Sequence, residues 1–261
     1  MSARLALSQF LVFVSFFITA LSLAEAGTFK VMPIKVYLED NQKTQTLTLR
    51  NESDEPVTLQ FEAMEWSQDR EGQDLYVPTK TIVMFPKIVT IKAGAEQLIR
   101  LGYQGPPAIN QERTYRVYLT ELPIAKPGEA TLKMAMRLGV PVFITPAKGK
   151  PALEIVQTSV EQHVIHLQVK NPSPRHGYVK TMQVVGRDAS GAEVFTTDAT
   201  GWYVLSGMQR TFPIQLPVHE CARVSTIHVT MIFSNKDLDQ PPVMTTTAVT
   251  GSPCHADATV R

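Results

Sequence analysis

The residue types that most often carry out chemistry are few in this chain, and their spacing does not bring them together. The chain has six histidines and two cysteines. His163 and His166 are three apart in a β-like run, so they would face opposite sides of a strand and cannot chelate one metal ion. A zinc site would need His219 and Cys221 to meet the late residues Cys254 and His255. No nucleophile elbow, phosphate-binding loop or Cys–His pairing occurs. The sequence therefore predicts no enzyme, no catalytic residue, no cofactor and no metal site.

A different kind of chemistry, the pairing of one strand with another, is indicated by the stretch Thr131–Pro146 (TLKMAMRLGVPVFITP). Apolar side chains occupy alternate positions along it: Leu132, Met134, Met136, Leu138, Val140, Val142 and Ile144. A period of two predicts one long strand with an apolar face. Methionine adapts to different partners, and Pro141 favours an edge strand or a bulge. The pattern fits a core strand of a sandwich, and it also fits an edge that can add a partner's strand.

The N-terminus predicts export. Arg4, a long apolar run and the sequence Ala24-Glu25-Ala26 form the three parts of a cleavable signal peptide over residues 1–26, with an uncleaved anchor as the alternative. No later run could insert into a membrane.

The net charge of +1 gives no case for nucleic-acid binding. In an exported protein Cys221 and Cys254 could form a disulfide, the alternative being two buried thiols.

The elements that would position these residues are short strands separated by turn clusters. Val57–Trp66 and Thr114–Leu122 alternate apolar and polar residues, and no convincing amphipathic helix follows them. Pro146–Pro151 (PAKGKP) is a linker between two β-rich halves. The sequence predicts an all-β protein of two immunoglobulin-like β-sandwich domains, over residues 27–146 and 147–261.

The order of these segments resembles the periplasmic chaperones of chaperone–usher pilus assembly. The matching pieces are PIKVYL, LTLRNESDEP, FPKIVTIKAGAEQLIRLGY and YRVYLTELP, all before Pro146, with weaker matches in the second half. The resemblance implies a boomerang of two domains in the periplasm. It also implies an ATP-independent chaperone that caps pilin subunits by donating a strand and delivers them to an outer-membrane usher.

The resemblance also implies roles for particular residues. The donor side chains would be Leu132, Met134 and Met136, with Leu138 and Val140 continuing the row. The family anchors the subunit's terminal carboxylate with an arginine and a lysine, and this chain departs at both places. The first position falls on Lys35 and the second on or next to Pro141. The nearby cations are Arg116 and Arg137.

A charged pair that the family places near the domain junction matches Arg100 and Glu121, for which a structural role is expected. The rival interpretation is a structural or adhesive surface module built from the same sandwiches, including a pilin-like subunit. The sequence leaves open which subunit is bound, and whether the free protein caps its donor edge by dimerising.

Overall fold

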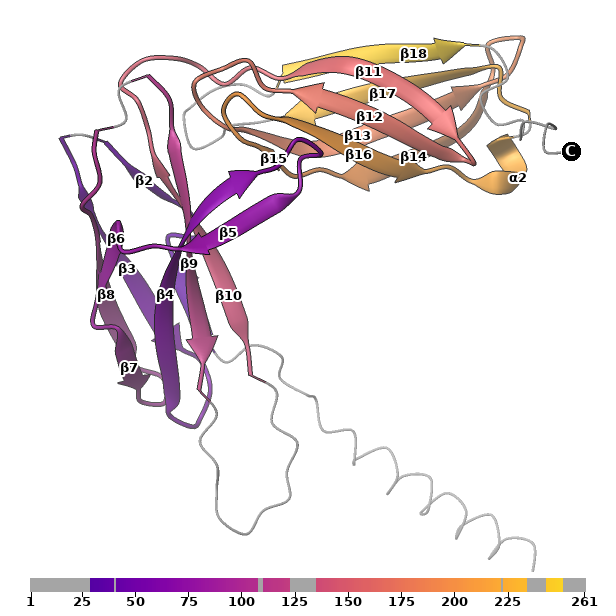
Figure 1. Cartoon of the computed structure of the whole chain (residues 1–261). Coiled ribbons are helices and arrows are strands. Elements are labelled where there is room, and N and C mark those ends of the chain that lie inside the picture. Colours follow the sequence, from indigo (N-terminus) through magenta and orange to yellow (C-terminus); the bar gives the residue numbers. More distant parts are fainter. Residues whose placement is uncertain are drawn as a thin grey trace, which may run out of the picture.

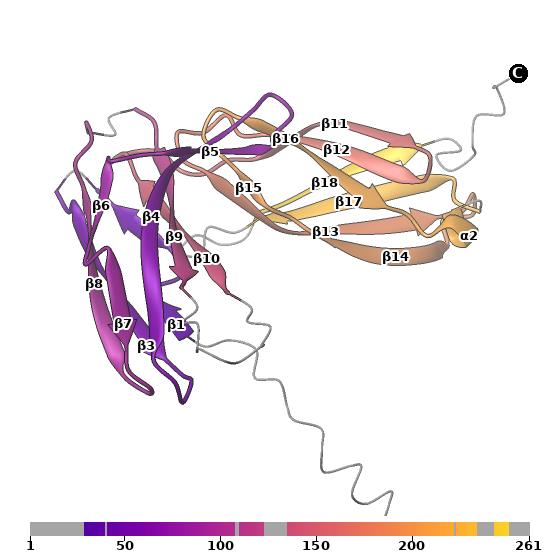
Figure 2. The ribbon, with the colours of Figure 1, turned by 60° about the horizontal axis from the view of Figure 1, so that its bottom comes forward.

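The computed structural model describes residues 29–39, 41–107, 110–122, 135–221 and 223–233, together with the backbone of the strand Val243–Thr250. It contains two β-sandwiches that lie crosswise to each other, so the molecule is bent at their junction like a boomerang (Figures 1 and 2). The predicted fold, all-β with two immunoglobulin-like sandwiches, is confirmed. The predicted signal peptide, residues 1–26, lies outside the described residues.

The first sandwich is formed by strands β1 to β10. Its four-stranded sheet has the order β1 (Phe29–Met32), β3 (Thr44–Asn51), β8 (Glu96–Tyr103), β6 (Ile82–Phe85). The six-stranded sheet has the order β2 (Val36–Leu38), β10 (Arg137–Ile144), β9 (Arg113–Glu121), β4 (Val57–Gln68), β5 (Asp74–Pro78), and β7 (Ile88–Ile91) also pairs with β4. Residues 137–144 of the stretch singled out from the sequence thus form β10, next to the short strand β2.

The second sandwich is formed by strands β11 to β18. One sheet has the order β11 (Glu154–Glu161), β12 (Val164–Lys170), β16 (Gln209–Gln215). The other has the order β14 (Glu193–Thr200), β13 (Gly177–Arg187), β17 (Thr226–Phe233), β18 (Val243–Thr250), and β15 (Tyr203–Val204) also pairs with β13. The short helix α2 (Val218–Cys221) precedes β17. No helix among the described residues is long and apolar enough to span a membrane.

Alternation of apolar and polar residues explains why these segments form sandwiches. In β8, Ile99 and Leu101 are completely buried whereas Glu96 and Arg100 are exposed. Successive side chains of a strand point to opposite faces, so each sheet turns one apolar face toward its partner sheet. Burial of each such aliphatic side chain contributes about 2 kcal/mol to stability.

Both domains use the same buried asparagine to hold a turn. Asn51 donates its amide to Ile91 O at 3.0 Å, and it accepts the backbone N–H of Ser53 at 2.9 Å. Asn171 of the second domain donates to Val204 O at 2.8 Å and accepts from Ser173 in the same way. The repetition of this arrangement shows that the two sandwiches are built on one plan.

The short helix α2, which ends at Cys221, lies at the end of the second sandwich far from the first domain (Figure 1). Cys221 ends α2, is completely buried and is disulfide-bonded. Cys254 lies outside the described residues, so the pairing of Cys221 with Cys254 stays a prediction.

Candidate functional site

The strand β10 is paired along both edges only at its C-terminal end. β9 pairs with all of β10, from Arg137 to Ile144, whereas β2 pairs only with the last three residues, from Val142. In the described part of the chain, no strand lies along the outer edge of residues 137–141. An unpaired edge offers backbone donors and acceptors to another chain. β10 therefore has an open edge within the stretch for which the sequence predicts strand donation.

The direction of the backbone groups follows from the hydrogen bonds at the two ends of β10. Glu121 N donates to Met136 O at 2.8 Å, so the backbone groups of Met136 face β9. Thr145 N donates to Leu38 O at 2.8 Å, on the β2 side. Backbone groups alternate between the two edges along a strand, and the pairing with β9 has no irregularity. The residues whose backbone groups face the open edge are therefore Arg137 and Gly139, whereas Pro141 lies beside Lys35, where β2 begins.

The apolar row of β10 lies on the inner face of the sheet. Val140 is 1% exposed, and Met136 and Leu138 are partly buried against the core of the first sandwich. The other two residues of the predicted donor set, Leu132 and Met134, lie outside the described residues. The apolar side chains of β10 thus extend the core of the first sandwich to the open edge. An added strand would make apolar contacts with them there.

Arg116 lies on β9 directly opposite Pro141, at the cleft between the domains. Its Nη1 donates to Tyr76 Oη at 2.6 Å. Its guanidinium carbon is 5.1 Å from the ring centre of Trp66 and 5.4 Å from that of Trp202, which belongs to the second domain. Cations over aromatic faces are attracted by the ring quadrupole. Arg116 thus places a positive charge in the cleft, surrounded by the aromatic rings of Trp66, Tyr76 and Trp202.

Tyr76 remains an uncharged phenol beside this cation. The pKa of Tyr76 is raised to about 12, chiefly because the phenol is buried; Arg116 lowers this pKa, and the Asp74 carboxylate contributes to raising it. The phenol oxygen can therefore accept the hydrogen bond of Arg116 while its own proton is directed to Asp74 Oδ2 at 3.4 Å.

Lys35 immediately precedes β2 and faces the second domain. Its Nζ lies 5.2 Å from the ring centre of Tyr178 and 5.8 Å from that of Tyr203. Val142 of β10 pairs with Val36, the residue after Lys35, so Lys35 stands beside Pro141. Lys35 and Arg116 therefore lie near the same end of the open edge, one on each side of β10.

Arg137 lies at the other end of β10, away from the second domain (Figure 1). It projects from the outer face of the sheet, with its guanidinium carbon 4.0 Å from the ring centre of Tyr118. Its Nη2 is 3.4 Å from Glu62 Oε2, and both side chains are about half exposed. The structure thus places only two of the three predicted anchor residues, Lys35 and Arg116, in the cleft.

An aromatic cluster fills the space between the domains. Trp66 and Phe143 come from the first domain, and Tyr203 and Leu205 come from the second. Phe143 is completely buried, although it belongs to the row of β10 that faces away from the core of the first sandwich. The apolar residue Phe143, in a row of β10 that points away from the core of the first sandwich, is the sequence signal for a second buried face.

A buried pair of Glu112 and His176 crosses the same junction. Glu112, just before β9, accepts from His176 N at 2.8 Å, and its Oε2 is 2.7 Å from His176 Nδ1. The side chains are 0% and 1% exposed, and the imidazole stacks on Phe143 with ring centres 3.8 Å apart. Glu112 Oε1 and His176 Nε2 are buried, and neither has a hydrogen-bond partner among the described residues. The sequence offered no local motif for this pair, because its members are 64 residues apart.

Arg100 and Glu121, for which an interdomain pair is expected, lie on different sheets of the first sandwich. Arg100 is exposed on the outer face of the four-stranded sheet, because the core positions of β8 are Ile99 and Leu101. Glu121 ends β9 in the opposite sheet, at the end far from the second domain, where its carboxylate lies 3.4 Å from Met136 N. Between the domains, the structure shows the pair of Glu112 with His176 and the ion pair of Asp74 with Arg210.

The hairpin of β4 and β5 extends from the first domain along the second (Figure 1). Asp74 on this hairpin accepts from Trp202 Nε1 at 2.6 Å and from Arg210 Nη1 at 3.3 Å, and it also accepts from the Gln68 amide at 2.9 Å. A Cβ on Gly72, at φ +82°, would lie 2.6 Å from Arg210 Cα. Only glycine fits this left-handed turn at such a close approach.

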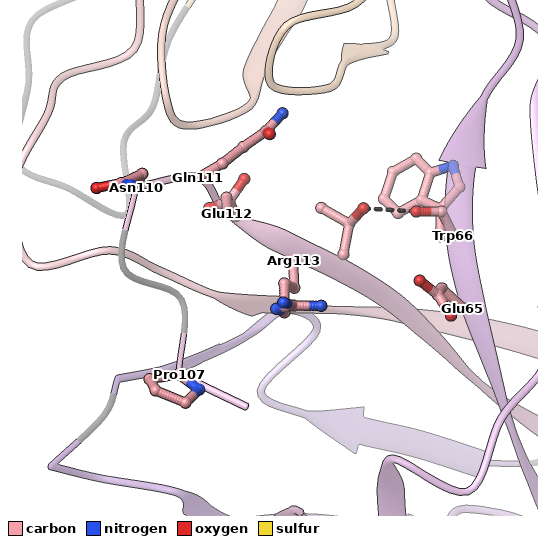
Figure 3. Close-up of a pocket in the computed structure, with 8 residues that line it drawn as sticks. Glu65, Trp66, Pro107, Asn110, Gln111, Glu112 and Arg113 are labelled. Atoms are coloured by element: carbon pink, nitrogen blue, oxygen red, sulfur yellow. Dashed lines mark hydrogen bonds between the residues drawn. The ribbon is translucent and has the colours of Figure 1, made fainter. Parts of the chain in front are cut away.

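A pocket of about 490 Å³ lies beside the junction, between the end of β4 and the loop that precedes β9 (Figure 3). Glu65 and Trp66 line it from β4, and Asn110, Gln111 and Glu112 line it from the loop. Glu112 is already bonded to His176. Within the described ranges, no three His, Cys, Asp or Glu side chains gather closely enough to hold a metal ion.

Comparison with solved structures gives the same two-domain fold. One match is the complex of CsuC, a chaperone, with CsuE, a tip adhesion subunit, from the Csu pili of Acinetobacter baumannii: identity is 22%, the TM-score is 0.60, and 84% of this chain and 98% of that chain are covered. The YadV chaperone matches at 17% identity and a TM-score of 0.58, covering 85% and 100%. The complex of the Salmonella enterica SafA pilin with the SafB chaperone matches at 15% identity and a TM-score of 0.53, covering 87% and 98%.

Comparison of sequences gives one family match, which covers the first domain. No curated protein is significantly similar to the chain. Residues 28–150 match the family described as pili and flagellar-assembly chaperone, PapD N-terminal domain. This range contains all strands of the first sandwich, including β10 with its open edge. The first domain of this chain is thus similar to the N-terminal domain of pilus-assembly chaperones.

Proposed function

We propose that the protein is an ATP-independent periplasmic chaperone, which holds a fimbrial subunit by adding the edge of β10 to it and passes it to an outer-membrane usher. The observation that carries this proposal is the open edge of residues 137–141 beside an apolar row. A sandwich that lacks a strand exposes a core groove and unpaired backbone groups. A lent strand supplies backbone hydrogen bonds and fills the groove at once.

The protein would then need no nucleotide, because the chain contains no phosphate-binding motif to use one. Assembly would be driven by exchange of the lent strand for a more complementary strand of the next subunit. The signal peptide predicted over residues 1–26 would export the chain to the compartment where this exchange takes place.

Lys35 and Arg116 are the residues that we propose bind the terminal carboxylate of the subunit. Both are cations in the cleft beside Pro141, which itself offers no charged group. Arg116 has the planar fork that suits a carboxylate. Arg137 is left out of this role because it lies at the far end of β10 beside Glu62.

Delivery to an usher requires a surface that stays accessible while β10 is occupied. A shallow groove of about 350 Å³ lies on the outer face of the four-stranded sheet, with Phe85 and Leu98 in its lining. These side chains are 78% and 59% exposed, and Arg100 adds a positive charge beside them. Exposed apolar patches of this kind mark interaction sites, and this one faces away from β10. We propose that this patch docks the usher.

Co-purification from periplasm tests the first step. We expect the wild-type protein to form a one-to-one complex with a fimbrial subunit, and Met136→Asp or Leu138→Asp to weaken it about tenfold or more, because a charge would enter an apolar contact. Leu98→Asp is the matched control and should leave the complex intact, since Leu98 lies on the opposite sheet.

Circular dichroism would first establish that each variant is folded. A complex that persists in folded Met136→Asp and Leu138→Asp variants would refute strand donation. A wild-type protein that binds no subunit would instead favour a structural or adhesive surface module.

A further inference from the structure

The first sandwich is open on a second side, away from β10. β6 forms the edge of the four-stranded sheet there, and within the described ranges no strand pairs with its outer side. Figure 1 shows β6 on the side of the domain opposite β10. The facing sheet also leaves this side uncovered in the middle, because β7 pairs with β4 only as far as Gln60 and β5 only from Met64.

The backbone groups of β6 that face this open side follow from one hydrogen bond. Gln104 N donates to Thr81 O at 2.9 Å, so the backbone groups of Thr81 face β8. Backbone groups alternate along a strand, and the pairing of β6 with β8 is regular. The N–H and C=O groups of Ile82 and Met84 therefore face the open side. An added antiparallel strand could exchange both backbone hydrogen bonds with each of these residues.

A pocket of about 490 Å³ lies beside this edge, between β6 and β4. Phe61 and Ala63 line it from β4, and Ile82 and Met84 line it from β6. Each of these core residues is at most 9% exposed, so the pocket reaches the margin of the core. Residues of an added strand that stand opposite Ile82 and Met84 would point their side chains the same way. The pocket therefore suits apolar side chains at two alternate positions of such a strand.

Positive charges stand at both ends of this edge. Lys80 precedes β6 by two residues and Lys87 follows it by two residues; both are exposed and both line the pocket. Neither lysine forms an ion pair with a described residue, whereas Glu62, which also lines the pocket, is 3.4 Å from Arg137. Edge strands are commonly protected by charges on the strand itself, but β6 (IVMF) carries none. The edge is thus open along its length and attracts carboxylates at its ends.

We propose that β6 and its pocket bind an extended acidic segment of another protein by strand addition. Two apolar residues at alternate positions of that segment enter the pocket, and carboxylates on either side of them pair with Lys80 and Lys87. The unpaired backbone groups of Ile82 and Met84 select a peptide over an aliphatic ligand. This site does not use β10, so it is independent of the proposed strand donation and stays accessible while a subunit is held.

A titration with a defined peptide tests the proposal. The probe is acetyl-Asp-Val-Thr-Val-Asp-amide, since valine and threonine favour strands. In isotope-labelled protein purified from the periplasm, we expect the amide resonances of Ile82 and Met84 to shift to saturation and their hydrogen exchange to slow. The resonance of Gly139, on the edge of β10, should stay unchanged. The same peptide with lysine in place of aspartate, or with N-methylated valines, should bind at least about tenfold more weakly.

Charge reversal at the two ends of the edge gives an independent readout. Lys80→Glu and Lys87→Glu should each weaken binding of the acidic peptide about fivefold, and less at high salt, because each replaces an attraction by a repulsion at an exposed site. The matched control is Lys170→Glu, on an exposed lysine of the second domain, which should leave the affinity unchanged.

Three results would overturn the proposal. The amides of Ile82 and Met84 could stay unshifted at millimolar peptide, or the lysine peptide could shift them as strongly as the acidic one. Decyl sulfate could shift them where the peptide does not, in which case the pocket takes an amphiphile. None of these results bears on β10, whose role is tested separately by Met136→Asp and Leu138→Asp.

Discussion

At the scale of single residues, the junction depends on Glu112 and His176, which the fold buries completely. Their hydrogen bond is made between two charged or polar groups in an apolar setting, because Phe143 stacks directly on the imidazole. Removal of one member of a buried pair leaves the other without compensation, which costs far more than removal of both. The pair therefore specifies one arrangement of the two domains.

We expect His176→Ala to destabilise the protein by about 3 kcal/mol, because the Glu112 carboxylate would be left buried and unpaired. The control is His228→Ala, on the half-buried outer row of β17. Urea unfolding gives both values. The double replacement Glu112→Leu with His176→Phe should recover most of the loss, and a double variant as unstable as His176→Ala would contradict this account of the pair.

At the scale of elements, the β4–β5 hairpin connects the domains by polar contacts that surround the aromatic cluster. Gln68 is 3% exposed and bonds to the second domain twice, donating to Tyr203 O and accepting from Leu205 N, each at 2.9 Å. Asp74 adds bonds to Trp202 and Arg210. The hairpin thus works as a clamp that limits movement of the cleft in which Lys35 and Arg116 lie.

We expect Asp74→Ala to loosen this clamp, because four side-chain donors would lose their acceptor. Small-angle X-ray scattering should show a broader range of interdomain angles than in the wild-type protein. Asp188→Ala is the control, since Asp188 bonds only within its own turn at Ser190 and Ala192. An unchanged scattering profile for Asp74→Ala would show that the aromatic cluster alone holds the domains.

The strands could be predicted from the sequence, whereas the contacts between the domains could not. The period of two in Thr131–Pro146 predicted the strand, and Pro141 predicted its place near an edge, because both properties are local. The partners across the junction could not be predicted, because Glu112 and His176 belong to different domains and neither lies in a motif. Matching by family order does not show which face of β8 Arg100 occupies, so the structural role expected for Arg100 and Glu121 stays a prediction.

At the scale of the whole molecule, the first domain carries two surfaces that face opposite ways. The edge of β10 belongs to the six-stranded sheet, and the patch of Phe85 and Leu98 belongs to the outer face of the four-stranded sheet. Occupation of one surface would leave the other accessible. A carrier that must hold one protein while it docks on another requires this separation.

The separation predicts a variant that binds its subunit but does not deliver it. Leu98→Asp changes a 59% exposed side chain, so the fold and the subunit complex should survive, while docking on an apolar partner should be lost because the buried charge would be unpaired. Co-purification should therefore give the wild-type yield of complex, and electron microscopy should show cells without fimbriae. The matched control is Val156→Asp, an exposed apolar residue of the second domain at 46%, which should leave fimbriae unchanged. Normal fimbriae on cells with Leu98→Asp would place the usher contact elsewhere on the molecule.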